Sequence, residues 1–370
     1  MGISGSAEVV VIGGGIMGAS TLYYLTRNGC TDAVLVERDT LGAGSTGKAA
    51  GGIRAQFSDE LNVRLGLESI RRYEQFGDEP GGEIDFKQWG YLFLLTNRAD
   101  VDAFAAGVAL QQAHGVPSRL LTADEAHAIV PGVNVEDVLA ATFCPIDGYA
   151  TPEAAVQGYA SAASQAGATI VQGCAAERIV IEDGRVAAVE TRHGRIATRR
   201  VVLTAGVWSG DLGRTAGVEI PVEAEPRHVF FTGPGDPLPH ELPLTIDFAT
   251  GFYFHRERPG LLVGGRARTL EALAPAAVHR LPALADVPFR GGWWGYYELS
   301  PDHNAIVGRT PDPDGLVYAT GFSGHGFQQG PVVGEHAALL ALDRPTPFDL
   351  RPFSLDRFAS GATRPERNVV

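Results

Sequence analysis

The sequence predicts an α/β protein in which a doubly wound layer carries an inserted sheet of mixed or antiparallel strands. Residues 8–37 alternate strand, glycine-rich turn, helix and strand, which is the pattern of a parallel βαβ unit. Residues 221–300 instead contain one strand-like segment after another, too many for a doubly wound layer, and so indicate a second domain. Further strand-and-turn segments at 200–206 and 316–327 return the chain to the first layer.

The N-terminal unit has the arrangement that binds a dinucleotide. Its first apolar strand leads directly into a turn with glycines at positions 13, 15 and 18. Gly13 permits a tight turn, Gly15 leaves room for a pyrophosphate, and Gly18 lets the helix pack closely on its strand. The helix that begins with Ile16 and Met17 would direct its N-terminal N–H groups at the phosphates.

A second apolar run ends at Glu37, whose carboxylate can accept both ribose hydroxyls of an adenine dinucleotide. This acid disfavours NADP, because its charge would meet that of the 2′-phosphate, and it leaves NAD and FAD. A nicotinamide enzyme would continue into another crossover helix, whereas residues 38–54 form a loop of small residues. Such a loop suits the ribityl chain and isoalloxazine ring of FAD, with the Ser45 and Thr46 hydroxyls as donors. A flexible surface loop is the alternative.

The C-terminal third supports FAD independently. Residues 316–320 are predicted to form a strand, residues 321–327 a glycine turn, and a helix is predicted to begin near Pro331. This helix would place its positive dipole end where negative charge develops on the pyrimidine part of a reduced flavin. The segment 200–206 is another strand that ends in small residues, and a hairpin with Asp183–Gly184 at its tip precedes it. Three separate segments therefore converge on one cofactor site.

Four segments resemble the FAD-dependent amine and amino-acid oxidoreductases typified by D-amino acid oxidase, glycine oxidase and sarcosine oxidase. They are VVVIGGGIMGASTLYYL, STGKAAGGIR, VVLTAGVWS and GFSGHGFQQGPVVGE. AGGIRAQFSDELNVRL, DFATGFYFHRE and YYELSPDHNAIVG look most like the flavin-bearing β subunits of sarcosine oxidase and proline dehydrogenase. The resemblance spans residues 8 to about 340. It implies a Rossmann-like FAD-binding domain of the glutathione-reductase type with an inserted substrate domain.

The resemblance and the strand pattern together predict a discontinuous FAD-binding domain, residues 1–85, 142–220 and 293–358. Residues 86–141 and 221–292 are assigned to the substrate-binding domain. The tail, residues 359–370, contains turn residues without periodicity and is expected to be poorly ordered. The expected FAD contacts are Gly13, Gly15, Ile16, Met17, Gly18, Glu37, Arg38, Gly44, Ser45, Thr46, Lys48, Ala49, Ala50, Gly51, Gly52, Ala176, Ala205, Gly206, Trp208, Gly324, His325, Gly326, Phe327 and Gln328.

The activity that the resemblance implies is oxidation of a C–N bond. A flavin removes a hydride from the carbon next to a neutral amine nitrogen, and the resulting iminium is hydrolysed. The amine lone pair drives the transfer, so no general base is needed, but the substrate must be anchored over flavin N5. The expected substrate is a small amine that carries a carboxylate, such as an N-methylated or cyclic amino acid.

Arg54 is the first candidate for the anchor, because a guanidinium can bind a carboxylate bidentately. A surface arginine or one that contacts FAD is the alternative. Tyr253 or Phe254, neighbours on an aromatic strand, would cap the substrate while the other packs in the core, and Arg266 corresponds loosely to a family position that faces substrate. His325 lies between two glycines, which leave its ring little to pack against except a ligand. Lys48, in the flavin loop, would help oxygen to accept electrons if it reaches N5.

Departures from the family pattern limit these expectations. Residues 295–298 contain no cysteine where monomeric sarcosine oxidases attach their FAD, so FAD is expected to be non-covalent. Residues 149–153 hold no equivalent of the histidine that carries a second flavin in the heterotetrameric enzymes. Leu262 or Val263 and Gln328 stand where the oxidases have lysines, which weakens the oxidase interpretation. The electron acceptor is therefore either O2 or a redox partner.

Two other functions stay open on the sequence alone. A 2-hydroxy-acid dehydrogenase of the same fold would need a base, with His325 or His255 as candidates. A flavin-bearing subunit of a larger electron-transfer complex would have its substrate site completed by a partner chain. The sequence does not decide between these and amine oxidation, and it leaves assembly into an oligomer open.

Composition excludes several partners. The net charge of −13 and the lack of a basic cluster argue against nucleic acid. Cys30, Cys144 and Cys174 are too far apart for a disulfide framework or a zinc site, so no metal is expected. No apolar run reaches ~18 residues, and the first strand begins too early for a signal peptide. These features favour a cytoplasmic protein without a membrane span.

Overall fold

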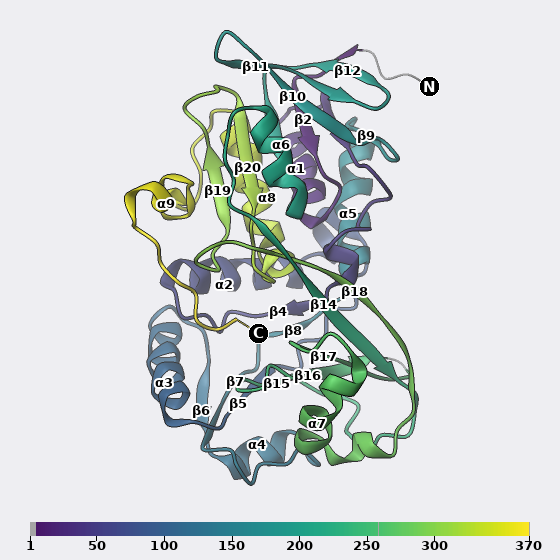
Figure 1. Cartoon of the computed structure of the whole chain (residues 1–370), viewed down its shortest axis with the longest axis vertical. Coiled ribbons are helices and arrows are strands. Elements are labelled where there is room, and N and C mark those ends of the chain that lie inside the picture. The colour runs from purple at the N-terminus through teal and green to yellow at the C-terminus, as the bar shows by residue number, and fades with distance from the viewer. Residues whose placement is uncertain (1–4, 258, 370) are drawn as a thin grey trace.

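The computed structural model of the protein describes residues 5–257 and 259–369. The lobe at the top of Figure 1 is built on a six-stranded sheet whose neighbours pair in parallel, except that β19 lies antiparallel to β20. The three predicted cofactor segments lie on adjacent strands of this sheet, β2, β13 and β20. Across the sheet, the strands are β19 (Ile306–Arg309), β20 (Leu316–Thr320), β13 (Val201–Leu203), β2 (Val9–Ile12), β3 (Ala33–Val36) and β9 (Thr169–Val171).

The uninterrupted apolar sequence of β2 follows from its burial on both faces. Val9 and Val11 pack among helices on one face, while Val10 and Ile12 pack against a four-stranded sheet on the other. Neighbouring residues of a strand point to opposite faces, so a strand covered on both sides needs apolar residues throughout. The helices are α1 (Ile16–Arg27), α5 (Pro152–Gln165) and α8 (Gly326–Ala341), and the small sheet is β1 (Gly5–Ser6), β12 (Gly194–Ala197), β11 (Arg185–Thr191) and β10 (Ala176–Glu182).

Several local elements form where the sequence predicts them. The hairpin of β10 and β11 turns at Asp183 and Gly184, whose φ angles of 50° and 72° belong to the turn type that matches strand twist. The apolar spacing of residues 59–76 predicts a helix, which is α2 (Glu60–Glu74), and a helix predicted from about residue 98 to 114 is α3 (Arg98–Ala113). Helix α2 begins where the Asp59 side chain accepts from the N–H groups of Leu61 and Asn62, which satisfies donors that the helix itself cannot.

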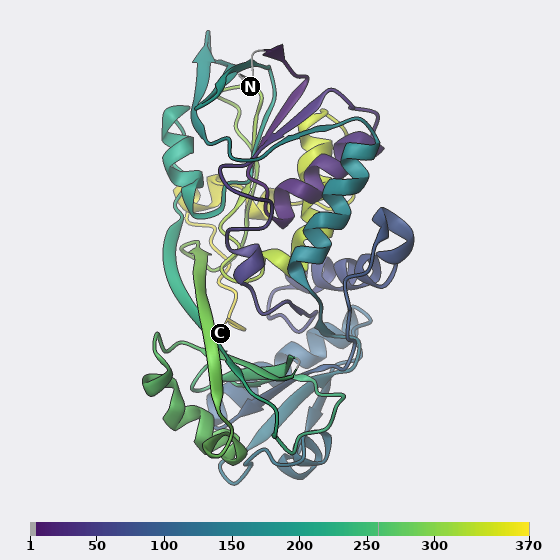
Figure 2. The ribbon, with the colours of Figure 1, turned by 90° about the vertical axis from the view of Figure 1, so that its right-hand side faces the viewer.

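The lobe at the bottom of Figure 1 holds an eight-stranded sheet. Its neighbours are antiparallel except β15 and β5, so the sheet is mixed, and β14 and β18 extend from it towards the first lobe (Figures 1 and 2). The predicted α/β fold with an inserted mixed sheet is confirmed, while the domain boundaries remain predictions. Across the sheet, the strands are β18 (Phe289–Leu299), β14 (Glu223–Thr232), β17 (Gly260–Gly265), β16 (Tyr253–Glu257), β15 (Leu244–Asp247), β5 (Tyr91–Leu95), β7 (Ala140–Cys144) and β6 (Arg119–Leu121).

Helices cover both faces of this second sheet. Leu92 and Leu94 of β5 pack in the cluster that contains α4 (Ala123–Ile129) and α7 (Leu270–Arg280), whereas Phe93 packs with α3 on the opposite face. No helix within residues 5–257 and 259–369 has the length and apolar character needed to cross a membrane. Further short elements are β4 (Gly52–Ile53), which pairs with β8 (Gly148–Tyr149), α6 (Ser209–Thr215) and α9 (Asp356–Ser360).

Two predictions for the C-terminal region are wrong. Helix α8 begins at Gly326 and contains Pro331, rather than beginning near it. A proline inside a helix leaves the carbonyl of the preceding turn without its N–H partner, and the Tyr73 hydroxyl donates to that carbonyl, on Phe327, at 2.6 Å. The tail is not loosely placed either, because Glu366 is 2% exposed and hydrogen bonds hold the segment to the loop before α2.

A buried ion pair fastens the C-terminal region to the first lobe. Arg357 donates to both carboxylate oxygens of Asp302 at 2.8 and 2.9 Å, and each side chain is 2% exposed. We expect Arg357→Leu to lower the free energy of unfolding by about 3–5 kcal/mol, because it leaves the Asp302 carboxylate buried without its partner. Urea denaturation measures this loss. The double variant Arg357→Leu/Asp302→Asn should recover part of it, and an undiminished loss would contradict the ion-pair explanation.

Candidate active site

A cavity of about 570 Å³ extends from the turn between β2 and α1 to the eight-stranded sheet. Residues of both lobes line it, and Gly18 is the single predicted FAD contact that does not. The predicted contacts in the lining are Gly13, Gly15, Ile16, Met17, Glu37, Arg38, Gly44, Ser45, Thr46, Lys48, Ala49, Ala50, Gly51, Gly52, Ala176, Ala205, Gly206, Trp208, Gly324, His325, Gly326, Phe327 and Gln328.

Gly13 and Gly18 bring α1 close to the sheet. Gly13 has a φ of 108°, which residues with a side chain rarely adopt, and a Cβ there would lie 2.4 Å from the Thr204 carbonyl oxygen. A Cβ on Gly18 would lie 1.8 Å from the Gly13 carbonyl oxygen. Gly18 therefore acts through helix packing, and the first turn of α1, with Ile16 and Met17, reaches the cavity.

Two helices begin at the cavity without a cap from the side chain of their own N-cap residue. Neither Gly15, at the start of α1, nor His325, at the start of α8, accepts a hydrogen bond through its side chain from the first turn. Uncapped N–H groups and the helix dipole favour an anion or a developing negative charge. The two helix starts thus suit the pyrophosphate and the reduced flavin ring that the sequence predicts at these positions.

Backbone donors hold Glu37 in place. Its carboxylate oxygens accept from the Gly14 N–H at 2.6 Å and from the Asp39 N–H at 2.8 Å. Each oxygen keeps a further lone pair, so Glu37 can still accept ribose hydroxyls. Beside it, the Arg38 guanidinium lies 3.8 Å from the centre of the Trp208 ring, and both residues line the cavity.

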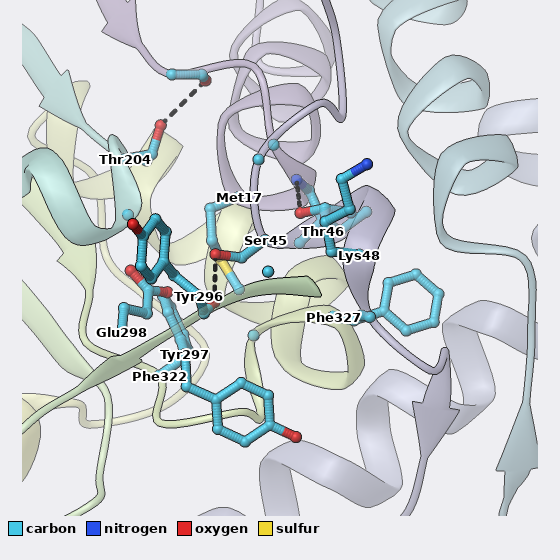
Figure 3. A pocket seen from close by; sticks show the side chains of 18 of the residues that line it. Met17, Ser45, Thr46, Lys48, Thr204, Tyr296, Tyr297, Glu298, Phe322 and Phe327 are labelled. Atoms are coloured by element: carbon cyan, nitrogen blue, oxygen red, sulfur yellow. Dashed lines mark hydrogen bonds between the residues drawn. The ribbon is translucent and has the colours of Figure 1, made fainter. Parts of the chain in front are cut away.

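The small-residue loop packs between α1 and β18. The Ser45 hydroxyl donates to the Tyr296 carbonyl at 2.6 Å, and the Thr46 hydroxyl accepts from the first N–H of α1 at 3.1 Å (Figure 3). Strand β18 approaches the loop so closely that a Cβ on Gly295 would lie 2.4 Å from the Lys48 side chain. These contacts disfavour the alternative of a flexible surface loop.

The lining of the cavity fits FAD. An acid, two helix starts and a small-residue loop lie along one cavity and match the ribose, pyrophosphate and flavin parts of this cofactor. Within the described residues, no group of histidine, cysteine, aspartate or glutamate side chains is arranged to hold a metal ion.

Arg54 also lines the cavity and is 3% exposed. Its Nη1 donates to the Gln56 carbonyl, its Nη2 donates to the Asn368 carbonyl, and Nη2 also lies 3.2 Å from His325 Nε2. Within residues 5–257 and 259–369, these contacts engage three of the five N–H donors of the guanidinium, and the Nε–H and one Nη1–H have no partner. A guanidinium can bind a carboxylate bidentately along its Nη1–Nη2 edge or its Nε–Nη2 edge. Both edges include Nη2, so the bidentate contact that the sequence predicts would displace the Asn368 carbonyl or His325.

His325 is a neutral neighbour of Arg54. Burial, together with the charge of Arg54, holds the pKa of His325 well below its usual value. Its Nε2 therefore accepts from Arg54, while its ring meets the Phe57 ring edge to face at 5.2 Å. The Arg54 guanidinium carbon lies 4.3 Å from the centre of the same Phe57 ring, so the two aromatic rings and the cation form one packed group.

Three tyrosines of the second sheet line the cavity with Arg54. They are Tyr91 on β5, Tyr253 on β16 and Tyr297 on β18, and Figure 3 shows Tyr297 directed away from Ser45. Burial raises the pKa of each phenol, so all three stay neutral and can donate hydrogen bonds. The site therefore combines one buried cation with neutral donors, which is a suitable environment for a carboxylate.

A family model described as FAD dependent oxidoreductase (DAO) matches residues 8–340. The chain belongs to the DAO family. Among solved structures, L-proline dehydrogenase from P. horikoshii superposes with a TM-score of 0.91 at 32% identity, over 98% of this chain and 100% of that one. Glycine oxidase from Geobacillus kaustophilus shares the fold, with a TM-score of 0.85 at 24% identity, over 95% of this chain and 99% of that one.

Sequence relatives agree with this membership. Mitochondrial sarcosine dehydrogenase of Homo sapiens is 30% identical over 97% of this chain and 42% of that protein. The formaldehyde-forming 4-methylaminobutanoate oxidase of Paenarthrobacter nicotinovorans is 31% identical over 95% of this chain and 46% of that protein. The chain spans less than half the length of these two relatives. The resemblance found in the sequence is confirmed: the chain belongs to the DAO family of FAD-dependent oxidoreductases.

Some candidate residues of this DAO-family enzyme lie away from the cavity. Arg266 is exposed and its side chain folds over Gly251, so it is not placed to hold substrate. Strand β17 ends just before it, and the alternation that would direct its side chain no longer applies. Arg268 is exposed as well. His255 is buried against Tyr149 outside the lining, and burial lowers its pKa to about 4.

Other residues at the site were not predicted. Arg227 on β14 lines the cavity 5.0 Å from the Tyr297 ring and forms an ion pair with Glu225. Glu298, next to Tyr297 on β18, accepts from the Thr320 hydroxyl at 2.9 Å, and burial raises its pKa to about 7. The aromatic run around Glu298 was the only signal in the sequence, and it does not tell which side chains face the cavity.

Asp147 supports the loop that carries Arg54. Its carboxylate accepts from the Ala55 N–H at 2.9 Å and from Gln56 Nε2 at 3.0 Å. The residue is fully buried, and burial raises its pKa to about 6. Asp147 comes from the turn between β7 and β8, far along the chain from Arg54, so no sequence pattern links the two.

Proposed function

We propose that this enzyme oxidises the C–N bond of a small amino acid or secondary amine that carries a carboxylate. The observation that carries the proposal is Arg54, a buried guanidinium with free donors at a cavity that fits FAD. The names of the relatives specify sarcosine, 4-methylaminobutanoate and L-proline, and each of these compounds has both a secondary amine and a carboxylate. The substrate carboxylate would accept from a free Arg54 donor and from the phenols of Tyr91 and Tyr297.

We also propose that FAD is held without a covalent bond. Cys30, Cys144 and Cys174 are free, buried and outside the cavity lining, so no thiol is placed to attach the flavin. The groups that would hold FAD are Glu37 at the ribose, the first turn of α1 at the pyrophosphate, and the loop of residues 44–52 beside the flavin ring.

Bound FAD supplies the acceptor for a hydride from the carbon next to the amine nitrogen. Arg54 and the tyrosines orient the substrate so that this carbon is presented in one position. The charge of Arg54 also favours a neutral amine, because a second positive charge nearby lowers the pKa of an ammonium group. His325, which is itself neutral, adds no charge and accepts a hydrogen bond that keeps Arg54 in place.

Amine oxidation is supported over 2-hydroxy-acid oxidation by the positions of the two candidate bases. His255 lies outside the cavity lining. His325 Nε2 faces the Arg54 guanidinium at 3.2 Å, where a proton gained by the imidazole would meet a positive charge. A hydroxy acid needs a base and an amine does not, so the arrangement suits the amine.

An anaerobic bleaching screen tests the proposal. We expect sarcosine, L-proline or a similar amino acid to bleach the yellow protein, because Arg54 supplies an anchor for the carboxylate and amine oxidation needs no base. Glycolate and lactate should leave the colour unchanged. Acid precipitation should release all of the flavin as intact FAD. Bleaching by hydroxy acids alone would overturn the proposed reaction, and flavin retained in the pellet would overturn the non-covalent assignment.

A further inference from the structure

Residues 364–368 form a segment, the C-terminal strap, that crosses the loop carrying Arg54. The end of the described chain, drawn in yellow, lies between the two lobes in both ribbon views (Figures 1 and 2). Glu366 is 2% exposed and Asn368 is 4% exposed, whereas Arg367 between them faces solvent. One side of the strap is therefore packed against the protein.

Glu366 fastens the strap close to Arg54. Its carboxylate accepts from the N–H and hydroxyl of Ser58 at 2.9 and 2.7 Å, from the Asp59 N–H at 3.2 Å, and from Asn62 Nδ2 at 2.9 Å. Each of these groups donates, so the position requires two acceptor oxygens. Charge-assisted hydrogen bonds are roughly twice as strong as neutral ones, and several converge here on one carboxylate.

Asn368 brings the strap into contact with the guanidinium itself. Its carbonyl accepts from Arg54 Nη2, and its Nδ2 donates to the Gln56 carbonyl at 3.2 Å. The same Gln56 carbonyl accepts from Arg54 Nη1. Strap and loop thus share one acceptor, and together they fix the plane in which the guanidinium lies.

We propose that the C-terminal strap positions Arg54 for the substrate carboxylate, with Glu366 as a positioning residue. The inference rests on the proposed function, in which Arg54 binds that carboxylate. A free arginine side chain samples many rotamers, and a group held in one orientation loses less entropy when it binds a ligand. The Asn368 carbonyl, held by Glu366 through the strap, removes this freedom and leaves the remaining Arg54 donors for the ligand.

Titration of the holoenzyme with acetate and with acetamide tests the inference, because the two probes differ in charge and have similar shape. Flavin absorbance reports binding. We expect Glu366→Gln to weaken acetate binding by about tenfold or more, because its amide NH2 would face groups that also donate. A shortened chain that ends after Pro365 should show the same weakening of acetate binding. Acetamide binding, flavin content and the exposed control Arg367→Ala should be unchanged.

The outcomes separate a positioning role from a merely structural one. Unchanged acetate binding in Glu366→Gln would overturn the inference, and so would equal weakening of acetate and acetamide, or tighter acetate binding. If the shortened chain does not fold, Glu366→Gln still decides. If Arg54→Ala itself leaves the preference for acetate intact, the proposed function fails. If Arg54→Ala abolishes the preference and the strap variants keep it, only the strap inference fails.

Discussion

Replacing Arg54 with alanine is expected to lower kcat/KM for a carboxylate-bearing substrate by about 100-fold. Hydrogen bonds to charged groups contribute ~1.5–3 kcal/mol each, and every ~1.4 kcal/mol corresponds to about a factor of ten. Arg54→Lys should restore little, because one ammonium cannot reach the Gln56 and Asn368 carbonyls and also a ligand as the planar guanidinium does. Steady-state kinetics with the substrate found by the bleaching screen measures the loss.

The matched control is Arg266→Ala, which removes an exposed arginine outside the cavity. This variant should keep the kinetics of the unchanged enzyme. For the Arg54 variants, the loss should disappear when the substrate is replaced by its decarboxylated amine, which has nothing to anchor. An equal loss with both compounds, or a fall in bound FAD that parallels activity, would mean that Arg54 supports the flavin or the fold instead.

The cofactor side of the molecule could be predicted because its signals are local. Position 13 needs a positive φ, and position 18 has no space for a Cβ, so both positions require glycine and can be recognised in the sequence. Glu37 follows from the length of one βαβ unit. The central strands β2 and β13 of this lobe are buried throughout, and they show as uninterrupted apolar runs.

The substrate side could be predicted only in part, because it depends on the register of distant strands. Tyr91, Tyr253 and Tyr297 come from three strands of the mixed sheet and meet only once that sheet has formed. Nothing in the pattern around Arg266 shows that its strand ends one residue earlier. Arg54 was a candidate from the sequence, whereas the partners that orient it were not.

The C-terminal region illustrates the same limit. Glu366 and Asn368 lie in a segment without helical or strand periodicity, and such segments are usually disordered. Here a tertiary hydrogen-bond network buries them, and their partners, Gln56, Ser58 and Asp59, lie about 300 residues earlier in the chain. Helix α8 likewise includes Pro331 because the Tyr73 hydroxyl satisfies a carbonyl that the proline leaves free. Local propensity gives no sign of either partner.

The second replacement expected to have a large effect is that of Glu37, at the end of the cavity that fits the ribose. Glu37 accepts from the Gly14 N–H through one oxygen and from the Asp39 N–H through the other, so both oxygens have fixed orientations. A ribose hydroxyl can then bind to a lone pair whose direction is already set, without further ordering of the side chain. The contribution of Glu37 to FAD binding should therefore be large for a single residue.

Glu37→Ala is expected to raise the dissociation constant for FAD by about 10- to 100-fold, from the loss of charge-assisted bonds to the ribose hydroxyls. Glu37→Gln should also weaken binding, because its NH2 group would meet one of the two backbone N–H donors. Flavin retained after extensive dialysis measures the effect. The control is Glu182→Ala, an exposed carboxylate on β10 that does not line the cavity. Full flavin occupancy in Glu37→Ala would show that the ribose is held elsewhere.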